Sequence, residues 1–301
     1  MAWDVVGVGA SCIDHACRVP VFPVAGASGS KVRLRSESRT CGGQTATALA
    51  ACQSFGLRTK YVGAVGDDAD GNRVCAELSA RGVDVADVVR VSGVATATAT
   101  ILVDDTGDRL VLWHRDPALL YGTAGLPASA LRSARLVHVD DVDEPAAIEA
   151  ARLARSAGVP VTCDLDHVTP GTAEFLAHVS IPIMAEHVPQ QLTGESEMEA
   201  ALRALRRRHP GLLVVTLGDR GAAALEGDRF VRVPAFRVSA VDTTGAGDVF
   251  RAGVIQAWLS GAGVEDALRF GNAAAAAACL NVGAMGGVPT LAAVLRLMAV
   301  G

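Results

Sequence analysis

The sequence predicts an α/β protein whose main sheet is mostly parallel and carries helices on both faces. The first observation is that apolar segments of strand length alternate with amphipathic segments of helix length, the order of repeated βαβ units. The second is that the chain has 301 residues, 50% of them hydrophobic, which is enough for a large core. The third is that no internal repeat or low-complexity linker divides it. We expect one large domain, alone or with a small appendage.

The main strands and helices are predicted from the periodicity of their apolar residues. The strands include KYVGAVG (60–66), ARLVHVD (134–140), VPVTCDLD (159–166) and LLVVTLG (212–218). The helices include GNRVCAELSARG (71–82), EPAAIEAARLARSAG (144–158) and SEMEAALRALRRRH (196–209). The alanine run at 273–278 favours a further helix, because alanine has the highest helix propensity. His138, within one of the strands, is expected to be a core or rim residue rather than a catalyst.

A small second sheet is predicted from two separate insertions. Residues 96–115 contain two alternating runs around the turn DDTGD, which indicates a β-hairpin. Residues 31–35, KVRLR, alternate basic and apolar side chains like a strand with one open face. Lys31, Arg33 and Arg35 would then point the same way. That face either binds an anionic substrate, with Lys31 as a candidate ligand, or merely keeps an edge strand soluble and unpaired.

Charge and cysteine usage exclude several classes of function. The net charge of −5, without blocks of like charge, gives no general attraction to nucleic acid. The seven cysteines show no C-x-x-C spacing, so neither a disulfide framework nor a zinc site is expected. The chain starts without a signal-like segment and has no apolar run of about 18 residues. We expect a soluble, cytoplasmic protein with no nucleic-acid or membrane partner.

Two nucleotide-binding motifs can be set aside. The N-terminal strand carries Gly7 and Gly9, but Cys12 stands where a dinucleotide-binding motif needs its third glycine, and two prolines follow. The only lysines, Lys31 and Lys60, do not stand in a P-loop pattern.

The segment VDTTGAGDVFRAG (241–253) is the strongest candidate site. FRVSAVD (236–242) is predicted as a strand, and the residues from Asp248 onward as a helix. Gly245, Ala246 and Gly247 then lie at the helix N-terminus, where free N–H groups and the helix dipole attract an anion. This turn is a predicted anion hole for a phosphoryl group in transfer.

Asp248 has two interpretations. A carboxylate beside the anion hole can accept the proton of an attacking hydroxyl, and in phosphoryl transfer its orientation matters more than strong basicity. Alternatively, Asp248 only complements the helix dipole, as acids in first turns commonly do.

The order of several motifs resembles the PfkB, or ribokinase-like, carbohydrate kinase family over nearly the whole chain. The motifs are VGVGASCID (6–14), CGGQTATALAACQSFG (41–56), VGAVGDDADGNRV (62–74), VVTLGDRGA (214–222), DTTGAGD with VFRAG (242–253) and FGNAAAAAACLNVGAMGGVP (270–289). This resemblance implies a ribokinase-like three-layer sandwich with a β-sheet lid. The core would comprise residues 1–11, 40–94 and 117–301, and the lid residues 12–39 and 95–116.

The resemblance also implies roles for individual residues. Asp248 becomes the catalytic base, beside the anion hole of Gly245, Ala246 and Gly247. The substrate would be held by Asp14, Gly42, Gly43 and Gln44. ATP would be bound by Thr216, Gly218 and Gly221 near its phosphates and by Asn272 beside the base. Asp242 would either hold a monovalent cation such as K⁺ or simply cap its turn.

Two positions depart from the family pattern. Thr47 stands where the family usually has an asparagine, which puts one sugar hydrogen bond in doubt. Ala185 and Val188 replace the acidic N-x-x-E motif, with Glu186 and His187 nearby but out of register. Support for Mg²⁺ must then come mainly from the ATP phosphates and water.

The predicted function is ATP-dependent phosphorylation of a primary hydroxyl on a sugar or sugar derivative. Several motifs, among them GGQTATA and DLDHVTP, are similar to the sulfofructose-kinase-like arm of the family, although Val142 replaces an arginine expected there. A homodimer through the lid is predicted. The alternatives are a nucleoside kinase and a non-catalytic sugar-binding regulator of the same fold.

Overall fold

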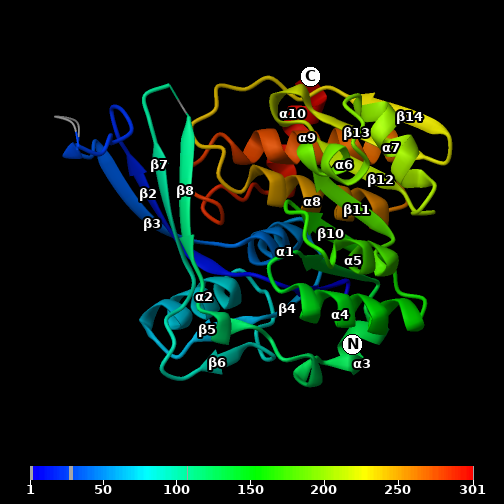
Figure 1. The fold of residues 1–301 in the computed structure, drawn as a ribbon, viewed down its shortest axis with the longest axis horizontal. Helices are drawn as coiled ribbons and strands as arrows, with labels where there is room; N and C mark the ends of the chain where they lie inside the picture. Colours follow the sequence, from blue (N-terminus) through cyan, green and yellow to red (C-terminus); the bar gives the residue numbers. More distant parts are fainter. Residues whose placement is uncertain (1–2, 27–29, 107, 301) are drawn as a thin grey trace.

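An eight-stranded sheet forms the middle layer of the computed structural model, which describes residues 3–26, 30–106 and 108–300 (Figure 1). From one edge to the other, its strands are β14 (Arg229–Val233), β13 (Ala222–Glu226), β12 (Leu213–Thr216), β11 (Ile181–Ala185), β10 (Val161–Leu165), β9 (Leu136–Asp140), β1 (Val5–Val8) and β4 (Thr59–Val62). The strands from β12 to β4 pair in parallel, whereas β13 and β14 are antiparallel additions. The predicted mostly parallel sheet is confirmed.

Helices cover both faces of this sheet. One face packs on α3 (Ala128–Ser133), α4 (Glu144–Ser156), α5 (Thr172–His178), α6 (His187–Thr193) and α7 (Met198–Arg206). The other packs on α1 (Gln44–Ser54), α2 (Ala69–Ala80), α8 (Ala246–Leu259), α9 (Val264–Ala278) and α10 (Leu291–Val300). The alternation of side chains along a strand supplies both cores, since Val6 and Val8 pack on the first face and Val5 on the second. The result is the expected three-layer sandwich.

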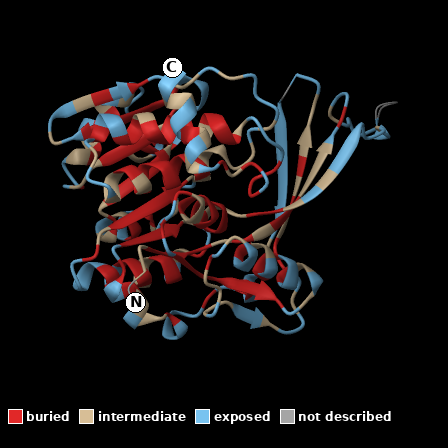
Figure 2. Cartoon of the chain, turned by 180° about the vertical axis from the view of Figure 1, so that it is seen from behind, coloured by how far each residue is buried: buried red, intermediate tan, exposed pale blue. Residues whose placement is uncertain are grey.

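A four-stranded sheet projects from the edge of this sandwich. Its order is β3 (Ser36–Gly42), β2 (Cys12–Arg18), β7 (Thr98–Val103) and β8 (Arg109–His114). β7 and β8 pair as the antiparallel hairpin predicted from residues 96–115. The outer part of this sheet is largely exposed, in contrast to the buried central layer (Figure 2). We call it the small sheet.

Two strand predictions were wrong. Residues 31–35 are not a strand: β3 begins at Ser36, so Lys31, Arg33 and Arg35 do not line a sheet face. Residues 236–242 are also outside any strand, because the N–H groups of Val241 and Asp242 bond to the carbonyl of Cys279 rather than to a neighbouring strand. In both cases local alternation is present but the segment forms no strand ladder, although the Arg35 N–H does bond to the Arg18 carbonyl at the end of β2.

Shorter elements complete the chain. β5 (Ala64–Gly66) and β6 (Val89–Val91) form a separate parallel pair. Among the described residues, short 3-10 helices occur at η2 (Pro117–Leu119), η3 (Thr123–Gly125) and η4 (Gly218–Arg220). All seven cysteines are free thiols. In the part of the chain that the structure describes, no helix is both long enough and apolar enough to span a membrane.

Candidate active site

The turn before α8 has the backbone geometry of an anion-binding helix start. Gly245 has φ of +77° at the N-cap, and a Cβ there would lie 2.7 Å from the Ala284 Cα. Glycine is therefore required both by conformation and by space. Ala246 N–H bonds weakly to the Thr243 carbonyl at 3.3 Å, while the N–H groups of Gly247 and Asp248 have no acceptor among the described residues. These free donors can receive a phosphoryl group.

Asp248 stands on the first turn of α8, half-buried and surrounded by other carboxylates. Burial raises its pKa to about 8, the positive charge of Arg251 opposes this rise, and Asp166, Asp14 and Asp140 add to it. A pKa near neutrality suits a general base. We call Asp248 and these three neighbouring acids the carboxylate group. Its members come from the first turn of α8, from the ends of β9 and β10 and from the small sheet, segments far apart in the sequence.

The predicted substrate residues lie where β2 and β3 meet the core. Asp14 pairs with Thr40 across the two strands, and its carboxylate lies directly over Gly42, where any side chain would collide with it. Burial raises the pKa of Asp14 to about 6, while the Cys12 thiol, 3.2 Å from its Oδ1, works in the opposite direction. Gly43 has φ of +99° and would place a Cβ 2.5 Å from the Ser11 Cα. Asp14, Gly42 and Gly43 thus meet at one point.

Other predicted substrate residues differ in their placement. The Gln44 amide at the start of α1 donates to Asp166 at 3.4 Å, on the side of the carboxylate group. Thr47 is fully buried, and its hydroxyl has no hydrogen-bond partner among the described residues. Lys31 is exposed in the loop that precedes β3, beyond the paired part of the small sheet. The structure therefore does not bring Lys31 onto a strand face with the other residues.

The predicted ATP residues lie at the carboxyl end of β12 and in the turn that follows it. Thr216 ends β12, and Gly218 and Gly221 flank η4 with φ of +59° and +93°. Glu186, directly after β11, forms an ion pair with Arg220 of η4, so an acid does lie beside this turn. Val188, which replaces the acid of the family motif, is fully buried in the core.

Asn272 on α9 is tied to the backbone. Its amide Nδ2 donates to the carbonyls of Val233 and Pro234, both at 3.1 Å, and the residue is only 5% exposed. The side chain fixes the loop that leaves β14, so any contact with adenine would use the remaining amide oxygen or the loop itself.

Asp242 links two loops beside the anion hole. Its Oδ1 accepts from the Thr244 N–H at 2.9 Å and its Oδ2 from the Gly283 N–H at 2.8 Å. Burial would raise the pKa of Asp242, but these backbone donors hold it below its usual value. The contacts are those of the capping interpretation. Among the described residues, no cluster of three or more His, Cys, Asp or Glu side chains has the arrangement of a metal site.

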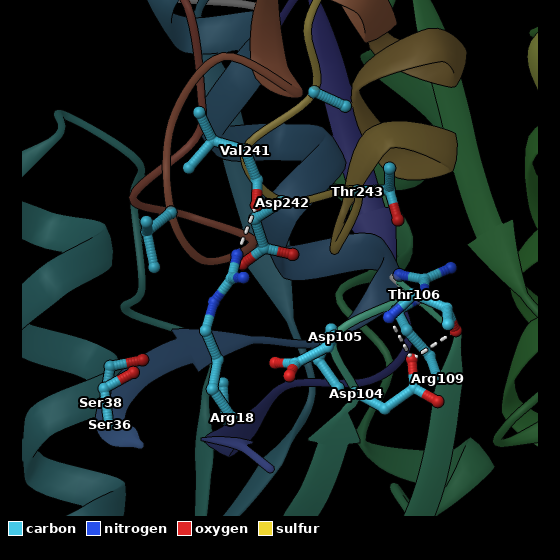
Figure 3. A pocket seen from close by; sticks show the side chains of 14 residues that line it. Arg18, Ser36, Ser38, Asp104, Asp105, Thr106, Arg109, Val241, Asp242 and Thr243 are labelled. Atoms are coloured by element: carbon cyan, nitrogen blue, oxygen red, sulfur yellow. Dashed lines mark hydrogen bonds between the residues drawn. The ribbon is translucent and has the colours of Figure 1, made fainter. Parts of the chain in front are cut away.

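A cavity of about 680 Å³ opens between the small sheet and the loop at 240–243 (Figure 3). Arg18 on β2 reaches across it and donates to the Val241 carbonyl at 2.6 Å. Ser36, Ser38 and Arg109 also line it. Asp242 lines this cavity, whereas Asp248 and Asp14 do not.

Sequence reasoning missed the buried arginine beside the turn. Arg251 on α8 is 3% exposed and contacts Asp164 and Asp166. The only signal was an arginine three positions after Asp248, within a helix that is otherwise apolar up to Trp258 apart from Gln256. Asp140, also missed, is fully buried and accepts from the Ala10 N–H and the Thr45 hydroxyl, both at 2.7 Å. It holds the β1 end and the α1 start together.

Several known proteins are similar to this chain in both sequence and fold. A family model described as pfkB family carbohydrate kinase matches residues 4–291. A nucleoside kinase from Methanothermobacter thermautotrophicus is 30% identical, covering 95% of this chain and 92% of its own. An ATP-dependent ribose-1-phosphate kinase from Halopiger xanaduensis is 32% identical, covering 95% and 94%. The structure of Arabidopsis thaliana ribokinase complexed with ribose and ATP superposes with a TM-score of 0.85 at 26% identity, covering 99% of both chains. The chain therefore belongs to the pfkB family of carbohydrate kinases and is an ATP-dependent phosphotransferase.

Proposed function

We propose that the protein transfers the γ-phosphoryl group of ATP to a primary hydroxyl of a sugar or sugar derivative, with Asp248 as the base. The observation that carries this proposal is the position of Asp248 beside the free N–H groups of the α8 turn. As the hydroxyl oxygen bonds to phosphorus, its proton passes to the Asp248 carboxylate and the bond from phosphorus to the β-phosphate oxygen breaks, releasing ADP. The free N–H groups of the turn stabilise the charge on the transferring group.

The acceptor is proposed to bind between the carboxylate group and the small sheet. Asp14 lies on one strand of that sheet, and the register places Ala99 and then Trp113 across from it on the same face. A carboxylate can orient sugar hydroxyls, and an indole can cover the apolar side of a sugar ring. The small sheet would then be the lid of residues 12–39 and 95–116, and its closure would exclude water from the reaction.

ATP is proposed to lie across the ends of β11 and β12, with its phosphates over Gly218 and Gly221 and its base near Asn272. Mg²⁺ usually keeps several waters and binds phosphates with one or two carboxylates, so this chain does not need a dedicated cage. Glu186 is the acid beside the turn at Gly218, and it suits such a supporting role. K⁺ is proposed to bind near Asp242, whose carboxylate already accepts hydrogen bonds from the backbone N–H groups of Thr244 and Gly283.

A homodimer in the cytoplasm is the proposed assembly. β8 is an edge strand whose six residues are all exposed, including Leu110, Leu112 and Trp113. An exposed apolar edge invites pairing with another strand, and a second copy of the small sheet offers one. Seven free thiols accord with a reducing compartment.

The test is ADP release from Mg-ATP with wild type and Asp248→Asn, across neutral ketoses and aldoses, sugar acids, sugar phosphates, sulfosugars and nucleosides. We expect one acceptor class to give turnover that falls by about three orders of magnitude or more in the variant. Turnover with nucleosides alone would favour the nucleoside kinase alternative. Nucleosides belong in the panel because a nucleoside kinase is 30% identical to this chain. Unchanged turnover in the variant would remove Asp248 from the mechanism. ATP and sugar binding without transfer by wild type would favour the regulator.

A further inference from the structure

A buried arginine lies directly under the anion-hole turn. The Arg251 side chain is 4% exposed, and its Nη2 contacts the Asp164 carboxylate and lies 3.4 Å from Asp166. Its Nη1 lies so close to the turn that a Cβ added at Gly247 would be only 2.7 Å from it. The guanidinium therefore occupies a fixed position between β10 and the first turn of α8.

Asp164 is the anchor of this arginine. It is 1% exposed, and its Oδ2 has no hydrogen-bond partner among the described residues. A buried carboxylate is costly unless it is paired, so the contact with Arg251 is what makes Asp164 tolerable at this position. The pair also explains why an arginine occurs on the buried side of α8.

The groups around Asp248 are mostly acidic. Asp164 and Asp166 approach from β10, Asp140 from β9, and Asp14 with the Cys12 thiol from β2. His138, also on β9, is neutral because burial and the nearby Arg251 lower its pKa to about 3. Arg251 is the cation that acts on Asp248 within this group. Without it, the neighbouring carboxylates would favour the protonated acid, which cannot accept a proton.

We propose that Arg251 is a positioning residue that acts through Asp248: clamped by Asp164 and Asp166, it fixes the turn that carries Asp248 and favours the ionised form of its carboxyl group. This inference rests on the proposed role of Asp248 as base. Asp164 has the opposite electrostatic effect on Asp248, because it is a further negative charge and draws on the same guanidinium. Removing Arg251 and removing Asp164 should therefore move the ionisation of Asp248 in opposite directions.

The experiment is a carboxyl ¹³C NMR titration of the whole protein labelled at aspartate, between about pH 5 and 10. The Asp248 resonance is identified by its absence from Asp248→Asn. We expect Arg251→Gln to raise the Asp248 midpoint by at least about one pH unit, the lower end of the usual effect of a neighbouring opposite charge, so that the group is titrated only partly or not at all by about pH 10. Arg251→Lys should restore most of the shift, and Asp164→Asn should lower the midpoint below that of wild type.

An unchanged midpoint in folded Arg251→Gln, or shifts of the same sign in Arg251→Gln and Asp164→Asn, would overturn the proposal. If Arg251→Gln does not fold because Asp164 is left unpaired, the comparison moves into the Asp164→Asn background. There, adding Arg251→Gln must still raise the midpoint, and no rise refutes the role. The titration needs no acceptor sugar, so an inactive substrate panel would count against the proposed function and leave this result readable.

Discussion

At the scale of single residues, the ionisation of Asp248 determines how activity should depend on pH. Burial and the surrounding acids raise its pKa to about 8 despite Arg251, and only the deprotonated form accepts a proton. We expect kcat/KM for the acceptor to rise about tenfold per pH unit below that value and to level off above it. Initial rates from pH 6 to 9.5 at saturating Mg-ATP measure this. A flat profile across pH 8 would contradict the assignment.

The same raised pKa has the opposite effect on stability. The folded state binds the Asp248 proton more tightly than the unfolded chain, whose aspartate pKa is about 3.9. The stabilisation is therefore present at low pH and is lost as pH rises toward about 8. Asp248→Asn removes this loss, so its melting temperature should equal or exceed that of wild type at pH 8.5 and show less pH dependence. The effect is moderate, because the side chain is half-buried. Melting curves of both proteins at pH 5.5 and 8.5 provide the test, and a variant less stable than wild type at pH 8.5 would refute it.

Glu186 is expected to matter for metal use rather than for folding. It is part-exposed and pairs with Arg220 beside the predicted phosphate turn. Glu186→Gln should raise the Mg²⁺ concentration for half-maximal activity by about tenfold, in the range found for supporting residues of metal sites. Arg220→Gln is the matched control, since it breaks the ion pair and keeps the carboxylate. Equal effects from both variants would assign Glu186 a structural role only.

The residues that could be predicted from sequence were those in glycine-rich turns with an acid beside them. Gly245 and Gly43 indicate backbone positions with positive φ angles, and Asp248 directly follows the turn that contains Gly245. Arg251 and Asp140 could not be predicted in the same way, because each acquires its meaning from partners on strands remote in the sequence. Burial and pairing of charge are tertiary properties.

At the scale of elements, the α8–α9 contact helps to set where the turn before α8, the proposed anion hole, lies. The two helices meet closely at Gly253 and Gly271, where a Cβ on Gly253 would lie 2.8 Å from the Gly271 Cα. Gly253→Ala must separate the helices or strain them, and we expect a loss of about 1–3 kcal/mol in the free energy of unfolding. Denaturant unfolding measures it. Gly122→Ala is the control, because nothing lies within 4 Å of the added carbon, and its effect should stay near zero. Equal stability of the two variants would show that the helices have room to adjust.

Elements with strong periodicity could be predicted, and elements defined by their partners could not. The β7–β8 hairpin has its pairing within one local segment, so alternation and a turn were sufficient. Residues 31–35 and 236–242 also alternate, but neither segment forms a strand ladder with a neighbour. On the side away from β7, β2 pairs with the polar segment 36–42, which ends in the buried residues Cys41 and Gly42. Hydrogen bonding across the sheet outweighs side-chain pattern there.

At the scale of the whole molecule, the fold places a rigid sandwich beside an exposed four-stranded sheet (Figure 2). The sandwich followed from composition and βαβ order, because large buried cores require both. The small sheet draws its strands from two insertions that only the tertiary structure brings together. Arg18 joins the two parts by its bond to the Val241 carbonyl, which ties the sheet to the loop before the anion hole. The position of the small sheet is thus linked to the turn proposed as the anion hole.

The exposed face of β8 yields a prediction about assembly. Leu112 is 56% exposed and Trp113 is 70% exposed, on opposite faces of the strand. If a second copy covers this strand, Leu112→Arg should convert a dimer into a monomer, as measured by sedimentation equilibrium.

Trp113→Ala, on the face shared with Asp14, should instead raise the KM for the acceptor several-fold. A wild type that is monomeric at all concentrations would refute the dimer, and Trp113 would then have to act on the substrate within one chain. A dimer that Leu112→Arg leaves intact would locate the interface elsewhere, because an arginine buried opposite an apolar strand without a partner would not be tolerated.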